Sequence, residues 1–347
     1  MLKLPKHSNQ YTRVSQTLQL LLLLLLVWLL GVLLSGCGSN GIDLGGSLGG
    51  SSGSSNGSTN GSKAIGEDVV PLGPARDNTP QVLVAEQPGV AVAGDGSAAL
   101  DYSNASEGYI CAASYAGDVK VKALVNAPDG AQYQYTLDPS GAWITIPLSV
   151  GSGNYVVQLF QNVYADQYAA LFAQDVYAEI TNEFGAFLYP NQYVDFDPDD
   201  QTVLLSQQLA EGATSEVQAV DQIYLWTVQN ISYDYDKAAN VAPGYLPDND
   251  DTLASKDGIC FDYAVLMASM CRAQRLPAKL DIGYAGSAYH AWIHVYTAES
   301  GWTTREIEFP GNSWVLMDPT FDSAGQGKGN IESIVGDGSN YQTVFNY

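Results

Sequence analysis

Apolar and polar residues alternate with a period of two between about Asp101 and Asp195. The run from Val119 to Val125 has an apolar residue at every second position, and Pro128-Asp-Gly130 after it is a turn signal. Four further runs have strand-like composition: Tyr133–Leu137, Trp143–Leu148, Tyr155–Phe160 and Ala173–Ile180. Short alternating strands with regular turns are typical of a β-sandwich. The pattern therefore predicts an all-β, sandwich-like domain.

After this region the apolar period changes to 3.6. Apolar residues three or four apart follow Ser215, which forms a capping-box pattern with Gln218 and predicts a helix ending near Asn230. A second helix is predicted from about Cys260 to Gln274; it is apolar on nearly all faces and should be buried. Predicted strands follow at Lys279–Tyr284, His290–Tyr296, Trp302–Glu308 and Trp314–Asp318. Two helices followed by an antiparallel sheet indicate an α+β domain.

The N-terminus has the pattern of an export signal. Three cationic residues precede an apolar run from Leu18 to Leu34, and small residues lead to Cys37. A charged region, an apolar region and a small-residue cleavage site describe a secretory signal. The alternative is an uncleaved membrane helix, since the run is nearly long enough to span a bilayer. Both interpretations place the rest of the chain outside the cytoplasmic membrane.

Residues 38–63 are nearly all Gly, Ser and Asn, a composition typical of a flexible tether. The next segment contains three prolines and is predicted to be irregular, with one strand at Gln81–Ala85. The predicted organisation has five parts: signal peptide 1–36, tether 37–63, irregular approach 64–100, β-sandwich-like accessory domain 101–200 and α+β domain 201–347. We expect a fragment starting near Asp195 to fold alone.

Charge and composition exclude several classes of function. The formal net charge is −23, with 37 acidic and only 14 basic residues. Such a surface repels phosphate backbones, which argues against nucleic acid as a partner. Only two histidines follow the apolar run, and the cysteines are not clustered, so a common zinc site is not predicted. No glycine-rich phosphate loop follows a predicted strand, and we expect no cofactor.

The four cysteines are Cys37, Cys111, Cys260 and Cys271. The last two are eleven residues apart on one predicted helix, a rise of about 16 Å. This separation is far too large for a disulfide. If Cys37 is modified, three thiols remain, and an odd number argues against a disulfide framework. Cys271 is predicted to be a buried core residue.

The last third of the chain contains a thiol, an imidazole and a carboxylate in separate blocks. They are Gly258-Ile-Cys260-Phe-Asp-Tyr, Tyr289-His290-Ala-Trp292 and Trp314-Val-Leu-Met-Asp318-Pro-Thr320. A nucleophile, a base and an orienting carboxylate are the parts of a catalytic triad. Cys260 is placed at a helix start, where backbone N–H groups favour a thiolate and could hold an oxyanion. His294 would lie on the same strand face as His290, either assisting it or as a partly exposed polar group.

These blocks resemble the transglutaminase-like superfamily of papain-like cysteine enzymes. The similarity runs from about Gln222 to Asp322 and includes three further blocks: Tyr245-Leu-Pro-Asp248, Leu276-Pro-Ala-Lys279 and Gly283-Tyr284. The accessory region resembles that of secreted clostridial members through Asp101-Tyr-Ser, Gly108-Tyr and Phe187-Leu-Tyr-Pro-Asn-Gln-Tyr-Val194. Leu34-Ser-Gly-Cys37 is similar to a bacterial lipobox. That likeness implies a lipoprotein anchored to the bacterial cell membrane through a lipidated Cys37.

The family resemblance implies a papain-like core of helices and antiparallel sheet. It implies that Cys260 is the nucleophile, His290 the general base and acid, and Asp318 the orienting carboxylate. Tyr233 is a candidate second oxyanion donor, and Trp292 is expected to pack beneath the site. The implied substrate is a protein or peptide amide at the cell surface, attacked to give an acyl-thioester that water or an amine resolves. The alternative is a non-catalytic cell-surface binding module on the same scaffold.

Overall fold

The computed structural model describes residues 74–286, 288–302, 307–309, 313–315 and 341–347. The predicted signal peptide, the tether, Cys37 and Asp318 lie outside these ranges. Residues Asp68–Tyr347 cluster as one compact unit. No helix in the part of the chain that is described has the length and hydropathy of a membrane span.

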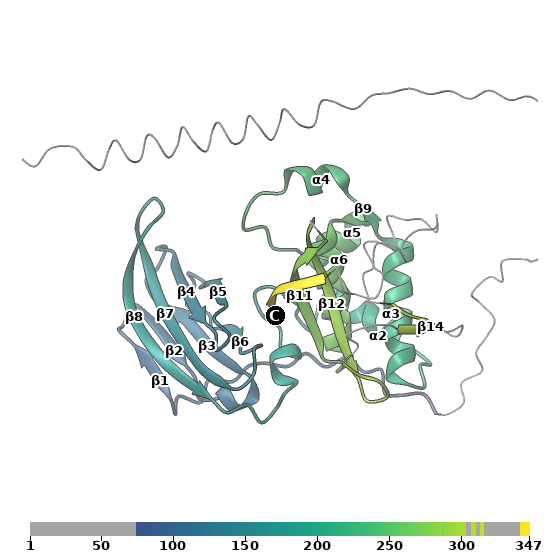
Figure 1. Cartoon of the computed structure of the whole chain (residues 1–347), viewed down its shortest axis with the longest axis horizontal. Helices are drawn as coiled ribbons and strands as arrows, with labels where there is room; N and C mark the ends of the chain where they lie inside the picture. The colour runs from purple at the N-terminus through teal and green to yellow at the C-terminus, as the bar shows by residue number, and fades with distance from the viewer. Residues whose placement is uncertain (1–73, 287, 303–306, 310–312, 316–340) are drawn as a thin grey trace, which may run out of the picture. The chain divides into compact units, whose positions relative to one another are not determined.

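The predicted all-β region is confirmed. It holds eight strands: β1 (Val92–Gly94), β2 (Ala98–Asp101), β3 (Tyr109–Ser114), β4 (Val121–Asn126), β5 (Gln132–Thr136), β6 (Ile144–Pro147), β7 (Gly153–Tyr164) and β8 (Gln167–Ala178). Two antiparallel four-stranded sheets result, ordered β1-β2-β3-β6 and β5-β4-β7-β8 (Figure 1). The runs predicted as strands correspond to β4–β8, and the sequence reasoning missed β1, β2 and β3.

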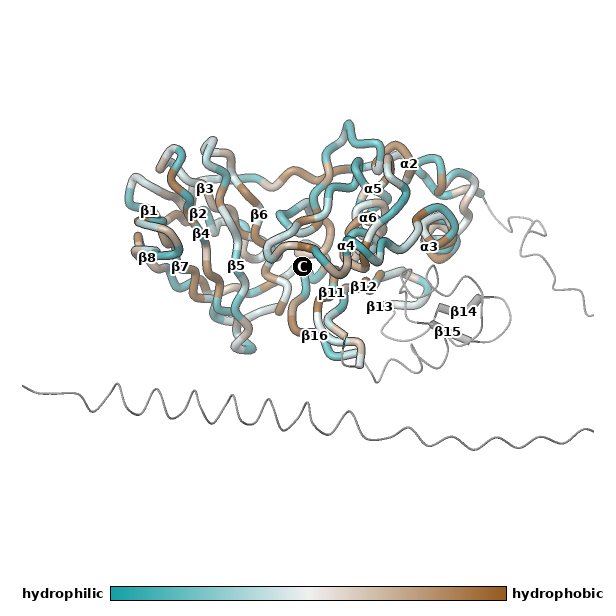
Figure 2. Tube along the Cα trace, turned by 90° about the horizontal axis from the view of Figure 1, so that it is seen from above, coloured by the Kyte–Doolittle hydropathy of each residue, from teal (hydrophilic) through white to brown (hydrophobic). Residues whose placement is uncertain are grey.

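Alternation explains how this region builds its core. On β4, Val121, Ala123 and Val125 are buried. On β5, Tyr133 and Tyr135 are buried, whereas Gln132 and Gln134, which alternate with them, are exposed. Figure 2 shows both brown and teal residues along the strands of this region. On each of these strands, one face therefore packs into the core and the other face lies outside it.

The predicted strand at Gln81–Ala85 is wrong. These residues have no regular secondary structure. The backbone N–H of Gln81 instead donates to the carbonyl of Ala273 at 2.8 Å, and Arg76 Nη2 donates to the carbonyl of Gln274 at 2.9 Å. The segment thus supplies donors to the end of a helix rather than pairing with a sheet. Strands β1 and β2 also lie in the stretch predicted to be irregular.

The α+β half begins with α2 (Gln201–Leu209) and α3 (Glu216–Asn230). The predicted α3 is confirmed, and its first turn is capped by Ser215, whose hydroxyl accepts from the Gln218 N–H at 3.0 Å. Helices α4 (Tyr235–Asn240) and α5 (Asn249–Ser255) were missed, as was α2. Asp234 and Asp248 cap α4 and α5 with their side chains. The prolines and acidic residues of this stretch were interpreted as a loop, so these two N-caps were not recognised.

The predicted buried helix is α6 (Cys260–Ala273), and all but its first two residues are buried. It packs against α2 and α3 and against the sheet β13-β12-β11-β16 (Figure 1). These strands are β11 (Ala278–Ala285), β12 (Ala288–Thr297), β13 (Gly301–Trp302) and β16 (Tyr341–Asn346). Two further short strands, β14 (Ile307–Phe309) and β15 (Ser313–Val315), pair with each other. The α+β fold class is confirmed, and β16 was not foreseen.

Contacts between the β region and the last strand argue against a self-sufficient fragment from Asp195 onward. Tyr133 Oη donates to Asn346 Oδ1 at 3.2 Å, and Ser149 Oγ donates to the Asn346 carbonyl at 2.7 Å. The Tyr133 and Tyr347 rings meet edge to face with centroids 5.5 Å apart. Removing the β region would expose these aromatic rings, at a cost set by the lost apolar burial.

Asp221 on α3 provides a test of pH-dependent stability. Its Oδ1 is buried and has no hydrogen-bond partner among the described residues, and burial raises the pKa of this carboxyl to about 6. Because the folded state binds the proton more tightly than the unfolded state, stability falls as pH rises from about 4 to 6. We expect Asp221→Asn to stabilise the protein at pH 7 by about 1 kcal/mol, allowing for partial exposure.

Urea unfolding at pH 7 and at pH 4 measures this gain, which should largely vanish at the lower pH. Asp118→Asn removes the same charge from an exposed site and should change stability little at either pH. An Asp221→Asn protein with no gain at pH 7 would show that burial does not penalise this carboxylate.

Candidate active site

A cavity of about 720 Å³ brings together Cys260 and His290, which are 30 residues apart in the sequence. Tyr233, the candidate oxyanion donor, lines it too. The other polar or aromatic lining residues are Gln132, Gln134, Tyr193, Tyr245, Phe261, Tyr289, Phe345 and Tyr347. The cavity thus combines a thiol and an imidazole with largely aromatic walls. Apolar walls with a few polar groups are the usual character of a small-molecule or side-chain site.

Cys260 is the first residue of α6, where backbone N–H groups lack helical partners. The preceding residues are fixed by β10 (Asp257–Gly258), which pairs in parallel with β9 (Ser232–Tyr233). The Asp234 N–H donates to the Gly258 carbonyl at 2.9 Å. A Cβ on Gly258 would lie 2.7 Å from Cβ of Asp262, so only glycine fits this approach. The same pairing sets Tyr233 beside Gly258.

Asp262, two residues after the thiol, organises this end of the helix. Its Oδ2 accepts from the Ile259 N–H at 2.7 Å and lies 2.9 Å from Lys237 Nζ. Tyr245 Oη donates to its Oδ1. The Asp262 side chain is fully buried, so these three partners replace its hydration. One carboxylate therefore holds the start of α6 and the segment from Lys237 to Tyr245, which forms a cavity wall.

The two side chains that contact this carboxylate, Lys237 and Tyr245, have shifted pKa values. Burial alone would lower the pKa of Lys237, but its hydrogen bonds to Tyr245 and Asp262 outweigh burial and raise it. Burial, followed by the hydrogen bond to Asp262, raises the pKa of Tyr245 to about 12. The Lys237 ammonium also lies 4.6 Å from the Tyr245 ring centroid. At neutral pH Lys237 is therefore a cation and Tyr245 a neutral phenol. The sequence reasoning missed it.

His290 lies near the start of β12 and is buried, with 7% of its surface exposed. Its partner across β11 is Gly283. A Cβ at Gly283 would collide with the backbone of Gln342 on β16, which explains the glycine. The His290 ring stacks on Trp292 with centroids 6.3 Å apart and planes 20° from parallel. Trp292 is fully buried and does not line the cavity, so it acts as packing behind the imidazole.

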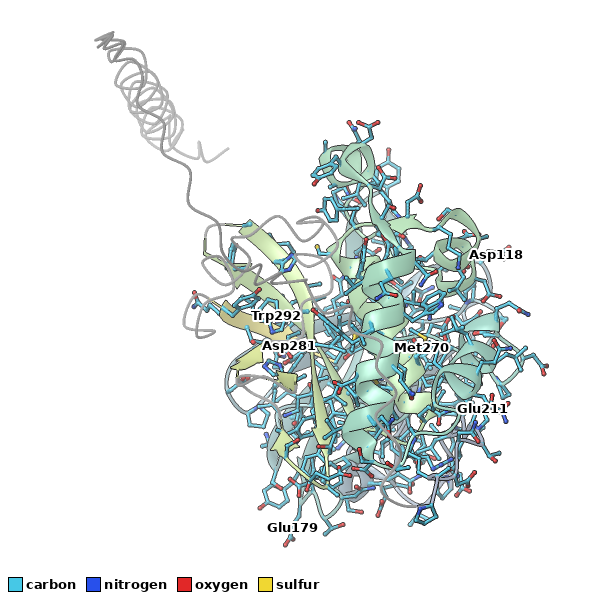
Figure 3. All side chains as sticks on the ribbon, turned by 90° about the vertical axis from the view of Figure 1, so that its right-hand side faces the viewer. Asp118, Glu179, Glu211, Met270, Asp281 and Trp292 are labelled. Atoms are coloured by element: carbon cyan, nitrogen blue, oxygen red, sulfur yellow. The ribbon has the colours of Figure 1, made fainter. Side chains whose placement is uncertain are left out.

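His294 has a carboxylate of its own. Its Nδ1 lies 2.6 Å from Oδ2 of Asp281, which faces Trp292 across the strand pair. Figure 3 labels Asp281 and Trp292 on this sheet. His294 does not line the cavity that holds Cys260. The pair therefore accounts for His294 without a part in the site, whereas the predicted partner of His290, Asp318, lies outside the described residues.

The other two described cysteines lack the setting of a nucleophile. Cys111 and Cys271 are buried free thiols. Burial raises the pKa of Cys111 to about 11 and that of Cys271 to about 12, so both stay protonated at neutral pH. Cys260 is partly exposed within the cavity. No group of metal-binding side chains occurs within the described ranges.

Comparison with known proteins assigns residues 204–319. A family model described as the transglutaminase-like superfamily matches residues 204–319. A UPF0252 protein of Methanocaldococcus jannaschii is 30% identical over 88 residues, which is 22% of this chain and 25% of that protein. The aligned part thus spans a quarter of that relative's length.

Two solved structures show weaker likeness. The periplasmic domain of TgpA from Pseudomonas aeruginosa is 14% identical, covering 73% of this chain and 100% of that one, with a TM-score of 0.31. Red sea bream transglutaminase is 11% identical, covering 61% and 48%, with a TM-score of 0.26. Likenesses this low support no argument about fold or chemistry. The family match stands on its own, and it identifies residues 204–319 as a transglutaminase-like domain.

Proposed function

We propose that this protein is a thiol acyl-transfer enzyme acting on protein or peptide amides. The observation that supports it most is the shared cavity of Cys260 and His290 at the start of α6. Cys260 attacks the carbonyl carbon after His290 takes the thiol proton. The tetrahedral intermediate collapses to an acyl-thioester, and the leaving amine departs with the proton from His290. Asp318 accepts the second ring N–H of His290 and fixes its tautomer.

The acyl-thioester is resolved by water, which gives a peptidase or amidase, or by an amine, which gives a transglutaminase. Both outcomes use the same triad, and we favour hydrolysis. The enzyme works outside the cytoplasmic membrane, held by a lipid on Cys37. The lipobox-like Leu34-Ser-Gly-Cys37 and the Gly/Ser-rich tether support this placement. No cofactor is required, because the thiol and imidazole supply the nucleophile and the proton relay.

Alkylation by iodoacetamide tests the nucleophile without a known substrate. At pH 7 Cys260 should react at least about tenfold faster than Cys111 or Cys271, since only thiolates react and both buried thiols are protonated. Mass spectrometry of the labelled peptides measures the three rates in one sample. Replacing His290 with alanine should slow labelling of Cys260 and leave the other two unchanged. Equal rates at all three cysteines would favour the non-catalytic binding module.

A further inference from the structure

Strand β5 lies at the edge of its sheet. The hydrogen bonds at its two ends show which of its residues bond to β4 and which face outward. The Leu137 N–H donates to the Val121 carbonyl at 2.9 Å, and the Ala127 N–H donates to the Ala131 carbonyl at 2.8 Å. Among the described strands, β5 pairs on one side only, with β4. In an antiparallel ladder, residues alternate between facing the partner and facing away. The odd-numbered residues of β5 therefore bond to β4, and the even-numbered ones turn their N–H and C=O groups outward.

Part of this outward edge is closed by side chains. The Thr136 N–H donates to Gln192 Oε1 at 3.0 Å, and Gln192 Nε2 donates back to the Thr136 carbonyl at 2.9 Å. Tyr193 Oη donates to the Gln134 carbonyl at 2.6 Å. Within the described structure, no partner occupies the Gln134 N–H or the backbone N–H and C=O of Gln132. The open edge is therefore short. Its free backbone groups are the N–H donor of Gln134, followed by the N–H donor and the C=O acceptor of Gln132.

This open stretch of β5 forms part of the wall of the cavity that contains Cys260. Gln132 and Gln134 both line it, as does Tyr193, which closes the edge at its far end. The strand is anchored, because Tyr133 and Tyr135, on either side of Gln134, are buried in the core. A fixed row of backbone groups beside a nucleophile is an unusual wall, since exposed edges are normally protected.

We infer that the open edge of β5 binds an extended segment of the peptide substrate by adding a short strand to the sheet. This inference rests on the proposed function and names the part of the substrate that is recognised. Alternating donors and acceptors at strand spacing match a peptide backbone. The main-chain bonds give affinity with little sequence preference, and the aromatic walls are left to select side chains. The β region is then part of the substrate site rather than a spacer.

Binding of β-casein, an unfolded protein, to the full chain carrying Cys260→Ala tests this without turnover. Adding Gln134→Pro removes the outward N–H but no bond to β4, and prolines are tolerated at such edge positions. We expect about tenfold weaker binding, the loss of roughly one well-placed hydrogen bond. Adding Gln134→Ala instead keeps the backbone N–H and should retain most of the affinity. Equal affinity of the proline and alanine proteins would overturn the inference.

Hydrogen exchange of the Cys260→Ala protein decides the matter if the proline variant fails to fold. Bound casein should slow exchange of the Gln132 and Gln134 amides, while the amides of Tyr133 and Tyr135, already bonded to β4, change little. Unaltered exchange at Gln134 with casein bound would refute docking at this edge. Neither measurement needs a catalytic Cys260, so a failure here is distinct from a failure of the alkylation experiment, which does not involve β5.

Discussion

Replacing Cys260 with alanine is expected to abolish acyl transfer, and replacing His290 with alanine to lower kcat/KM by about 1,000-fold or more. The first change removes the atom that forms the thioester. The second removes the group that takes the thiol proton and returns it to the leaving amine. Asp318→Ala should be milder, because an orienting carboxylate takes no part in the bond changes. Adding it to His290→Ala should cost little more, since triad members act as a unit.

Release of 4-nitrophenol from 4-nitrophenyl acetate measures these effects without knowledge of the natural substrate. A burst equal to the enzyme concentration would report the acyl-enzyme, and it should be missing from the Cys260→Ala protein. His294→Ala is the matched control, because His294 is paired with Asp281 and lies outside the cavity. Full activity of His290→Ala together with loss in His294→Ala would transfer the role of base to the His294–Asp281 pair.

Replacing Arg272 with leucine is expected to destabilise the protein by about 3 kcal/mol. This arginine is 1% exposed. Its guanidinium donates to the main-chain oxygens of Tyr189, Ala278 and Tyr347 at 2.8 to 3.1 Å. The substitution would leave three main-chain oxygens without these donors and a void where the guanidinium packs. It would also untie the β region, the start of β11 and the end of the chain from one another.

Urea unfolding monitored by tryptophan fluorescence measures this loss as a lower midpoint with an unchanged slope. Arg275→Leu is the control, because its side chain also bonds to carbonyls, those of Asp77 and Thr79, but is one-third exposed. We expect a loss below about 1 kcal/mol for this surface position. Equal midpoints for the two variants would show that burial of Arg272 contributes nothing to stability.

Periodicity and capping predicted the elements whose signals are local. Helix α3 was recognisable because Ser215 and Gln218 mark its start, and α6 because apolar residues cover it. By contrast, α2 has a weakly apolar surface. The short helix α5 begins with acidic residues, a composition that is also typical of a loop. β16 was missed because a strand that pairs with β11 across 60 residues has no local marker.

The residues of the candidate site can be divided in the same way, into those with a local sequence signal and those without one. Cys260 and His290 were identifiable because each lies in a recognisable block, and the fold brings both to one cavity. Asp262 stands in the same block as the thiol, yet its role depends on Lys237 and Tyr245, which reach it from another segment. The alternation within Tyr133–Leu137 predicted a strand. It carried no information that the polar side of that strand would border the nucleophile.

The shared carboxylate at Asp262 has an evolutionary consequence. The residue that caps the nucleophile's helix also anchors the wall from Lys237 to Tyr245. A mutation that reshapes this wall to admit a new substrate therefore disturbs the thiol's backbone, unless it spares the anchor points. Specificity should diversify more readily in another part of the lining, at the side chains of Gln132 and Gln134, which can change without altering the helix that carries Cys260.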